Sequence, residues 1–238
     1  MTELYNKEIA THYAAFRPPL HQVILAKVLA RGERFSAGLD VGCGTGYSTV
    51  ALAEYSHAVL GIDPSLSMLD EALPHERITY SQGSGEEIPL SNDAVDVVTF
   101  AGSLFYAKSD ALLSELRRVC RPEAVVIVYD FEILLDHFLR NWGISAPELE
   151  GGYDHELNFS GVAGFEEIIV GNEQVQVDAS VEELAHVLLS DLYRYEAFVA
   201  FYGTRDPFRA LINDLGRLGD SLSLRANVFF ASYHLGVW

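Results

Sequence analysis

The hydrophobic pattern divides most of this chain into short apolar runs and longer segments of helical periodicity. The apolar runs predict strands at residues 38–41, 57–62, 78–81, 95–100, 125–129, 165–170 and 226–235. The helical spacing predicts helices at residues 4–15, 20–30, 45–55, 64–73, 110–121, 133–142, 180–192, 195–201 and 207–218. The run at 57–62 is continuous rather than alternating, which is typical of a strand buried on both faces of a parallel sheet.

Local signals place the ends of some of these elements. Pro18 and Pro19 end the first helix, because proline cannot donate a backbone hydrogen bond. Ser180 and Glu183 have the spacing of a capping box, which begins a helix. Between residues 131 and 163 the pattern is less regular, and we interpret this segment as an insertion over the carboxyl ends of the strands.

The composition is that of a globular protein with a strongly acidic surface. Lys and Arg number 16 against 34 Asp and Glu, which gives a formal net charge of -18. Such a charge repels a nucleic-acid backbone, so we expect no nucleic-acid partner. No apolar run approaches the roughly 18 residues that a membrane helix needs, and the first residues lack the apolar core of a signal peptide. Two cysteines are too few for a disulfide framework. We therefore expect a cytoplasmic protein without a membrane partner.

Three alternating glycines follow the first predicted strand. Gly42, Gly44 and Gly46 can adopt positive φ and bring backbone amides close to a ligand, because glycine lacks a Cβ. The N-terminus of the following helix favours a carboxylate or a phosphate. A dinucleotide fingerprint needs G-x-G-x-x-G, but Tyr47 stands where its third glycine belongs. No lysine follows, as a P-loop requires. Taken alone, the glycines also fit a plain structural turn.

An acidic residue ends the predicted strand 57–62. Asp63 follows the glycines by about 20 residues, which is where a carboxylate accepts hydrogen bonds from both ribose hydroxyls of a nucleotide. Pro64 and Ser65 begin the next predicted helix, so a helix-capping role for Asp63 is the alternative.

These features, in this order, resemble motif I and the ribose-binding acid of the class I S-adenosylmethionine (SAM)-dependent methyltransferases. Residues 82–90 resemble the adenine-side loop of that family, and residues 115–122 resemble its helix-to-strand connection. The segment 10–18 is similar to an N-terminal segment of small-molecule methyltransferases that folds over the cofactor. That likeness places Tyr13 and Arg17 near the methionine end of SAM. A surface helix whose Tyr13 packs on the domain is the alternative.

The resemblance implies a Rossmann-like, doubly wound α/β fold. Its seven-stranded sheet would be mostly parallel, with an antiparallel last strand between the fifth and sixth strands and with helical cap elements. The resemblance also implies a single domain over residues 1–238, with an N-terminal lid at about 1–31 and cap insertions at about 131–163 and 180–222.

The same resemblance assigns the cofactor-binding residues. The glycine loop would bind the methionine part of SAM, Asp63 the ribose, and the loop around Glu86 the adenine side. Asp40 would either support the loop or reach the ammonium group of SAM through water. The full set is Tyr13, Arg17, Asp40, Gly42, Gly44, Gly46, Asp63, Pro64, Ser84, Gly85, Glu86 and Ala101. No metal site is expected, because no histidines have metal-ligand spacing.

The chain departs from the family pattern at several positions. Ser84 stands where the family has an acid that contacts the adenine amine, and a hydroxyl is a weaker acceptor than a carboxylate. Phe105 and Tyr106 stand where related enzymes often have His-Trp, so no imidazole base lies at that position. Tyr13 and Tyr106 are the candidates for orienting the acceptor, although an aromatic after a strand is as often part of the core.

The activity implied by the resemblance is transfer of a methyl group from SAM to a small-molecule acceptor by in-line displacement, which leaves S-adenosylhomocysteine. Because the cofactor is already activated, positioning supplies most of the catalysis and a general base is optional. One alternative is a SAM-binding or regulatory protein of the same fold without methyl transfer. Another is a nucleotide-dependent oxidoreductase, which Tyr47 opposes.

The acceptor has no diagnostic motif in this sequence. His12, His137 and His155 read as ordinary surface or core histidines. Five aromatics are candidates for lining an acceptor pocket, with plain packing as the alternative: Trp142, Tyr153, Tyr193, Tyr195 and Tyr202. The sequence contains no motif that indicates the oligomeric state.

Overall fold

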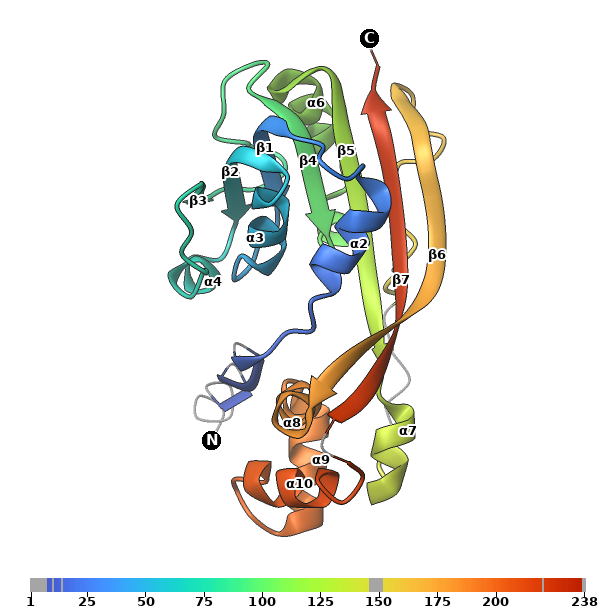
Figure 1. Cartoon of the computed structure of the whole chain (residues 1–238). Coiled ribbons are helices and arrows are strands. Elements are labelled where there is room, and N and C mark those ends of the chain that lie inside the picture. Colours follow the sequence, from blue (N-terminus) through green and yellow to red (C-terminus); the bar gives the residue numbers. More distant parts are fainter. Residues whose placement is uncertain (1–7, 10, 14, 146–151, 220, 237–238) are drawn as a thin grey trace. The chain divides into compact units, whose positions relative to one another are not determined.

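The structure, a computed structural model, describes residues 8–9, 11–13, 15–145, 152–219 and 221–236. These residues contain a seven-stranded sheet with the order β3-β2-β1-β4-β5-β7-β6 (Figure 1). The strands are β1 Phe35–Val41, β2 Ser56–Asp63, β3 Ile78–Gln82, β4 Val95–Ala101, β5 Cys120–Leu134, β6 Phe165–Ser180 and β7 Ser221–Leu235. The first five strands pair in parallel, whereas β7 runs opposite to β5 and β6 (Figure 1).

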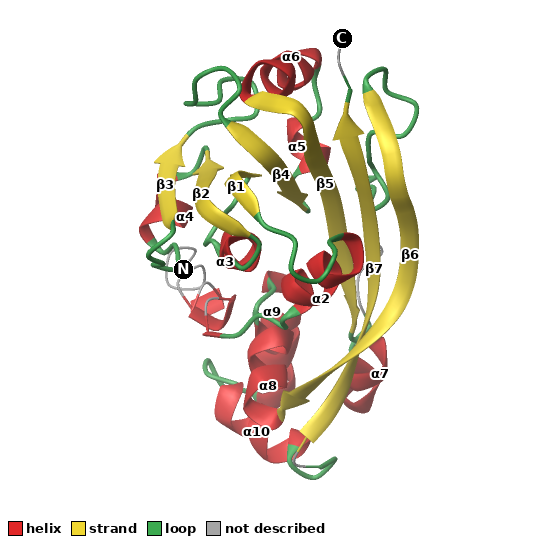
Figure 2. Ribbon diagram, turned by 45° about the horizontal axis from the view of Figure 1, so that its top comes forward, coloured by secondary structure: helices red, strands yellow, loops and turns green. Residues whose placement is uncertain are grey.

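Helices follow most strands and lie on both faces of the sheet. They are α2 Leu20–Val28, α3 Tyr47–Ala53, α4 Leu66–Asp70, α5 Leu104–Ala107, α6 Asp110–Val119, α7 Asp136–Leu139, α8 Val181–Leu189, α9 Leu192–Tyr202 and α10 Phe208–Leu215, with a 3-10 turn η1 at Arg140–Trp142. Figure 2 shows α2 and α3 on one face of the sheet and α5 and α6 on the other. The expected doubly wound, Rossmann-like α/β fold is therefore confirmed.

The last three strands are longer than predicted. β5 continues to Leu134, so the predicted helix 133–142 is wrong at its start and α7 begins only at Asp136. β6 extends to Ser180, well beyond the predicted end at residue 170. Its second half reads Gly-Asn-Glu-Gln-Val-Gln-Val-Asp and is mostly exposed. An apolar run cannot reveal this half, because most of its side chains are polar.

The chain divides into two compact units, neither of which is continuous in sequence. The unit that we call the sheet unit comprises Leu20–Phe131, Tyr153–Glu173 and Val228–Trp238. The unit that we call the helical unit comprises Met1–Pro19, Glu132–Gly152 and Gln174–Asn227. The strands β5, β6 and β7 each contribute residues to both units. The single domain with a lid and two cap insertions stays a prediction.

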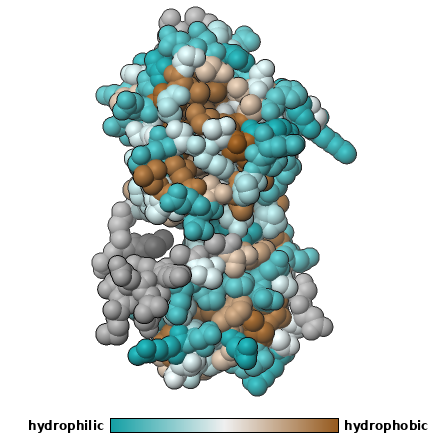
Figure 3. All heavy atoms as spheres, turned by 90° about the vertical axis from the view of Figure 1, so that its left-hand side faces the viewer, coloured by the Kyte–Doolittle hydropathy of each residue, from teal (hydrophilic) through white to brown (hydrophobic). Residues whose placement is uncertain are grey.

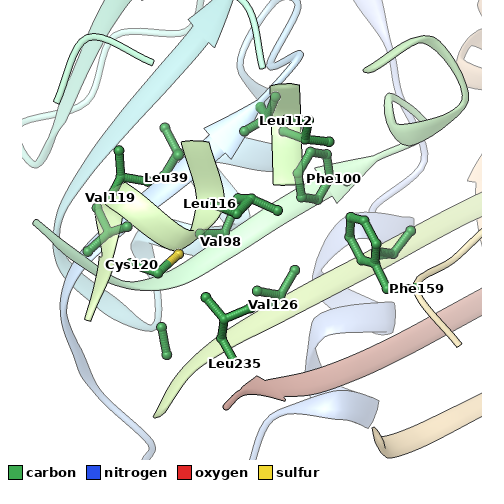
Figure 4. Close-up of a cluster of buried hydrophobic side chains, with 14 of the residues drawn as sticks. Leu39, Val98, Phe100, Leu112, Leu116, Val119, Cys120, Val126, Phe159 and Leu235 are labelled. Carbon is green, nitrogen blue, oxygen red and sulfur yellow. The ribbon is translucent and has the colours of Figure 1, made fainter. Parts of the chain in front are cut away.

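The core of the sheet unit forms between its strands and α6 (Figure 4). Leu112 and Leu116 are fully buried on the inner side of α6, and Phe100 of β4 is buried in the same cluster. Phe159 joins them from the segment before β6, with its ring 5.8 Å from that of Phe100. The predicted insertion 131–163 thus contributes a fully buried side chain to this core.

The helical unit has its own core and its own helix caps. Ser180 and Glu183 form the predicted capping box, with the Ser180 amide 2.7 Å from the Glu183 carboxylate. α9 begins three residues earlier than predicted, because the Asp191 side chain accepts a hydrogen bond from the amide of Arg194 at 3.0 Å. In the predicted helix 4–15, residues 8, 9, 11–13 and 15 are helical, and the others lie outside the described residues.

The side of the sheet unit near its β3 edge mixes polar and apolar residues at the surface (Figure 3). Among the described helices, none is long and apolar enough to cross a membrane. Cys43 and Cys120 are buried free cysteines, and burial raises the pKa of the Cys120 thiol to about 12.

Candidate functional site

The glycine loop between β1 and α3 has the backbone that the sequence predicts. Gly42, Gly44 and Gly46 have φ values of 72°, 52° and 84°. The amide of Gly42 donates to the carbonyl of Ile62 at 2.8 Å, which fixes the loop against the end of β2. A Cβ at Gly42 would lie 2.5 Å from the Cβ of Ser103. Only glycine fits there, because the loop approaches the end of β4 this closely.

Asp40, near the end of β1, supports this loop through buried hydrogen bonds. Its side chain is fully buried, and both carboxylate oxygens accept hydrogen bonds. Ser48 and Thr49 donate to Oδ2 at 2.6 and 2.7 Å, and Thr99 donates to Oδ1 at 2.7 Å. Burial raises the pKa of Asp40 against these three hydrogen bonds, which act to lower it. Asp40 thereby connects β1, α3 and β4, while its expected contact with the ammonium group of SAM stays a prediction.

Asp63 lies at the end of β2 and contacts the glycine loop directly. Its Oδ2 accepts a hydrogen bond from the amide of Gly44 at 2.9 Å, and its Oδ1 accepts one from the amide of Ser65 at 2.9 Å. The first bond is the loop contact, and the second is a local turn contact before α4, whose N-cap is Ser65 rather than Asp63. Pro64 is exposed, and its carbonyl accepts a hydrogen bond from Gln82 at 3.1 Å. The carboxylate and the loop are thus neighbours.

The predicted adenine-side loop follows β3. Ser84 is half-buried, and its hydroxyl accepts a hydrogen bond from the amide of Glu86 at 3.3 Å. Glu86 itself is exposed. Gly85 is buried, and a Cβ there would lie 2.9 Å from Leu112. This loop therefore packs closely on α6.

A charged pair on α6 fixes the end of that loop, and sequence reasoning did not assign it this role. Glu115 accepts a hydrogen bond from the amide of Ile88 at 2.7 Å, and Arg118 donates to the carbonyl of Ile88 at 2.9 Å. Arg118 also pairs with Glu115 at 2.7 Å. These contacts hold the pKa of Glu115 below its usual value, mainly through the Arg118 hydrogen bond.

Aromatic side chains gather after β4. Ala101 is the last residue of β4, and Gly102 follows it with a φ of 69°. Phe105 and Tyr106 lie on α5 and are 37% and 79% exposed. The ring of Tyr153 lies 4.8 Å from that of Phe105 and 5.9 Å from that of Tyr106. The structure therefore places Tyr106, a predicted site residue, next to Tyr153. The sequence had left two interpretations of Tyr153 open, a residue of an acceptor pocket or plain packing.

A histidine and an aspartate meet beside these aromatics. His155 Nδ1 lies 2.7 Å from Asp130 Oδ2. The Tyr153 hydroxyl lies 2.8 Å from the same Asp130 oxygen and 2.9 Å from the carbonyl oxygen of Gly102. Asp130 was not among the predicted residues, and His155 was read as an ordinary histidine. The available signal was weak: Asp130 follows an apolar run, as Asp63 does, but β5 continues past it.

The other sequence candidates lie in the helical unit. The Arg17 guanidinium stacks over the Tyr13 ring at 4.0 Å, and the contacts of both residues with SAM stay predictions. Trp142 donates to the Tyr202 hydroxyl at 2.8 Å. Tyr195 is buried and hydrogen-bonded to the carbonyl of Arg205. Among the described residues, no group of three or more His, Cys, Asp or Glu side chains could bind a metal ion.

Residues 39–128 match the model of a family described as a methyltransferase domain. A Dictyostelium discoideum protein named as a methyltransferase is 25% identical over 127 residues, which cover 53% of this chain and 48% of that protein. The malonyl-[acyl-carrier protein] O-methyltransferase of Serratia marcescens is 34% identical over 116 residues, which cover 48% of this chain and 44% of that enzyme. The chain thus spans less than half the length of these curated relatives.

A solved structure supports the same fold over nearly the whole chain. A protein from Anaeromyxobacter dehalogenans, assigned as a type II methyltransferase, aligns with a TM-score of 0.65 and 22% identity. The alignment covers 94% of this chain and 100% of that one. The match of residues 39–128 to this family model, together with the glycine loop, the strand-end Asp63 and the sheet order, supports a class I SAM-dependent methyltransferase.

Proposed function

We propose that this chain transfers the methyl group of SAM to a small-molecule acceptor and releases S-adenosylhomocysteine. The observation that carries the proposal is the contact between the glycine loop and the strand-end acid. Asp63 Oδ2 accepts the hydrogen bond of the Gly44 amide at 2.9 Å. A strand-end carboxylate beside a glycine loop is an arrangement that can bind a ribose and a carboxylate, which are both parts of SAM.

The loop residues fit this cofactor. A Cβ at Gly44 would meet no atom within 4 Å, so the space beside that residue is open to a ligand. Asp63 would bind the ribose hydroxyls. The backbone of Gly42, Gly44 and Ala101 would bind the methionine part, and the loop at Ser84 would bind the adenine. When bound, SAM supplies a methyl group on a sulfonium, which needs no further activation.

A small-molecule acceptor is supported by charge and by the aromatic group after β4. The chain carries a formal charge of -18, which disfavours polyanionic substrates. The rings of Phe105, Tyr106 and Tyr153 lie together and are partly exposed, so they offer aromatic faces on which a small molecule can pack. The Serratia relative is named for O-methyl transfer, so oxygen acceptors are the first class to test.

One specific observation favours the second candidate, a SAM-binding protein without methyl transfer. Ser84 replaces the acid that the family uses toward the adenine amine, and its hydroxyl already accepts the amide hydrogen bond of Glu86. A weaker contact with the adenine would reduce the affinity for SAM, as in a protein that binds SAM without transferring its methyl group. The two candidates differ in product, since only the enzyme releases S-adenosylhomocysteine.

Calorimetric titration with SAM tests the cofactor. We expect binding by the wild-type chain and at least about tenfold weaker binding by Asp63→Asn, because one charge-assisted hydrogen bond contributes roughly 1.5–3 kcal/mol. Asp70→Asn, at the exposed end of α4, is the matched control and should bind like the wild type. Absence of binding at about 1 mM SAM would contradict the proposal.

Product release tests the transfer itself. We expect S-adenosylhomocysteine to accumulate when the chain is incubated with SAM and a panel of small alcohols, phenols, amines and carboxylates. Intact SAM binding without product on any of these acceptors would favour the second candidate.

A further inference from the structure

The pair Asp130 and His155 lies next to the end of β4, where Ala101 pairs with Tyr129. Asp130 follows Tyr129, whose carbonyl accepts a hydrogen bond from the amide of Gly102 at 2.8 Å. Ser103, the next residue, donates its hydroxyl to the carbonyl of Val41 at the start of the glycine loop. Two residue contacts therefore connect the pair to the cofactor loop. Ligands of such sheets bind outside the carboxyl ends of their parallel strands.

The geometry of the pair fixes one tautomer of His155. Its Nδ1 lies 2.7 Å from a carboxylate oxygen, so this nitrogen carries the proton. The second ring nitrogen, Nε2, is then an acceptor in the neutral imidazole. Within the described part of the chain, no hydrogen-bond partner contacts Nε2. The ring itself stacks on Phe229 at 5.5 Å, with an interplanar angle of 14°, which limits its rotation.

A cavity opens beside the pair, within the sheet unit. It has a volume of about 400 Å³, which lies in the range of small-molecule pockets. Its walls combine apolar and polar groups: Leu157, Val170, Phe229, Asn158, Asn172 and His155 itself. Glu156 also lines it, and its carboxylate accepts a hydrogen bond from Asn172 at 2.9 Å.

We propose that His155, oriented by Asp130, is the proton acceptor of the transfer, and that the acceptor is an uncharged small molecule with a hydroxyl group. This inference rests on the proposed function. A carboxylate acceptor has no proton to lose, so its methylation would not need a base such as His155. Glu156, which lines the cavity, also repels a carboxylate. An alcohol or phenol needs the base, and the apolar walls accommodate its carbon skeleton.

The acceptor oxygen gives its proton to Nε2 of His155 and uses a lone pair to bond the methyl carbon. The electrons of the broken carbon–sulfur bond stay on the sulfur of S-adenosylhomocysteine. Asp130 stabilises the resulting imidazolium across the 2.7 Å contact. The His155 side chain is 25% exposed, so the proton can pass on to water.

Tyr153 is a positioning residue in this arrangement. Burial and the neighbouring Asp130 raise the pKa of its hydroxyl, so it stays protonated and donates. It contacts both Asp130 and the carbonyl of Gly102, so it fixes the carboxylate relative to the end of β4.

The tautomer is measurable without cofactor or acceptor. In nitrogen-15 NMR spectra of the chain with labelled histidine, we expect His155 as the Nδ1–H tautomer, and we expect Asp130→Asn to shift the population toward Nε2–H. A wild-type His155 found mainly as Nε2–H would overturn the proposal, because its Nε2 could not accept a proton.

Transfer to a matched pair of probes tests the base. The probes are 4-ethylphenol, which has a proton to lose, and 4-ethylbenzoate, which has none. We expect His155→Gln to lower the rate with 4-ethylphenol by about 10²- to 10⁴-fold, as loss of a general base does. His57→Gln, an exposed histidine on β2, is the control and should transfer like the wild type. Equal rates for His155→Gln and the wild type, or wild-type transfer to 4-ethylbenzoate alone, would overturn the inference.

SAM calorimetry distinguishes a failure of the proposed base from a failure of the proposed function. The His155→Gln variant should bind SAM as the wild type does, since His155 is outside the cofactor loop. If neither chain binds SAM, the proposed function fails. If both bind and both transfer equally, the inference fails and the proposed function stands.

Discussion

Gly44 differs from the other two glycines of its loop in what surrounds it. A Cβ at Gly42 would collide with Ser103, and a Cβ at Gly46 would collide with the ring of Tyr80. A Cβ at Gly44 would meet nothing within 4 Å. Substitutions at Gly42 and Gly46 therefore disturb the fold of the loop, whereas one at Gly44 mainly changes the space offered to a ligand.

The Gly44→Ala variant should stay folded and bind SAM poorly. Its positive φ costs roughly 1 kcal/mol for alanine, whereas the added methyl group occupies the space that the cofactor needs. We expect at least about a tenfold rise in the dissociation constant for SAM, measured by calorimetry. Gly32→Ala, also at positive φ with open space around it, is the control for strain alone. Equal SAM affinity of the two variants would contradict this assignment of the loop.

Asp40 makes a prediction about stability. Asp40→Ala would leave the hydroxyls of Ser48, Thr49 and Thr99 buried without their acceptor, and it would open a cavity. We expect a loss of about 3 kcal/mol or more in the free energy of unfolding, measured with urea. Asp40→Asn keeps one acceptor oxygen and should lose less. If both variants lost the same amount, the hydroxyls would have found other acceptors.

Single residues were predictable where a local motif carried them. Gly44 and Asp63 belong to short segments whose spacing indicates their task, and the structure places them in hydrogen-bond contact. Asp130 and His155 lie 25 residues apart in sequence and meet only because the segment before β6 returns to the end of β5. No periodicity encodes such a meeting, because it depends on tertiary packing.

At the scale of elements, two helices far apart in sequence share a histidine pair. His12 lies in the N-terminal helical segment and His186 in α8, with their Nδ1 atoms 2.9 Å apart. Both rings contact Phe208 of α10. Burial lowers the pKa of each histidine, and the charge of His186 lowers that of His12 further.

This pair makes the helical unit sensitive to acid. Below about pH 6.5, the unfolded chain binds protons on these histidines that the folded chain resists, so the free energy of unfolding falls with pH. We expect faster hydrogen exchange of the α8 amides at about pH 5 than at about pH 7.5, after correction for intrinsic rates. His186→Gln should reduce this dependence, and His57→Gln should not. Slower corrected hydrogen exchange of the α8 amides at about pH 5 would contradict the predicted loss of stability in acid.

The lengths of β5 and β6 show where element prediction stops. Their first halves are apolar or half-buried and were expected as strands. The second half of β6 has mostly polar side chains, whereas the first half, although just as exposed, contains the apolar residues Ile168, Ile169 and Val170. Backbone pairing with β7 makes the second half a strand, and such pairing leaves no trace in hydrophobicity. The helix α9 was also predicted too short, because the cap at Asp191 begins it before the predicted start.

At the scale of the whole chain, the family segment does not contain its own complete core. Phe159, Tyr233 and Leu235 are buried with residues of β1, β4 and α6 but lie after residue 128. We expect a fragment of residues 20–131 to lack a cooperative urea transition by circular dichroism. In the full chain, Phe159→Ala alone should cost about 3–5 kcal/mol. A fragment that unfolds cooperatively at the midpoint of the full chain would contradict this.

The position of β7 has a consequence for synthesis. Among the seven strands it is the last to leave the ribosome, yet it lies between β5 and β6. Until β7 is synthesised, β5 has an unpaired edge and β6 has no neighbouring strand. Two strands of about fifteen residues therefore have backbone N–H and C=O groups without a partner strand. Pairing over such sequence separations is slow. The nascent chain is therefore most exposed to aggregation and to chaperones in the interval between the synthesis of β6 and that of β7.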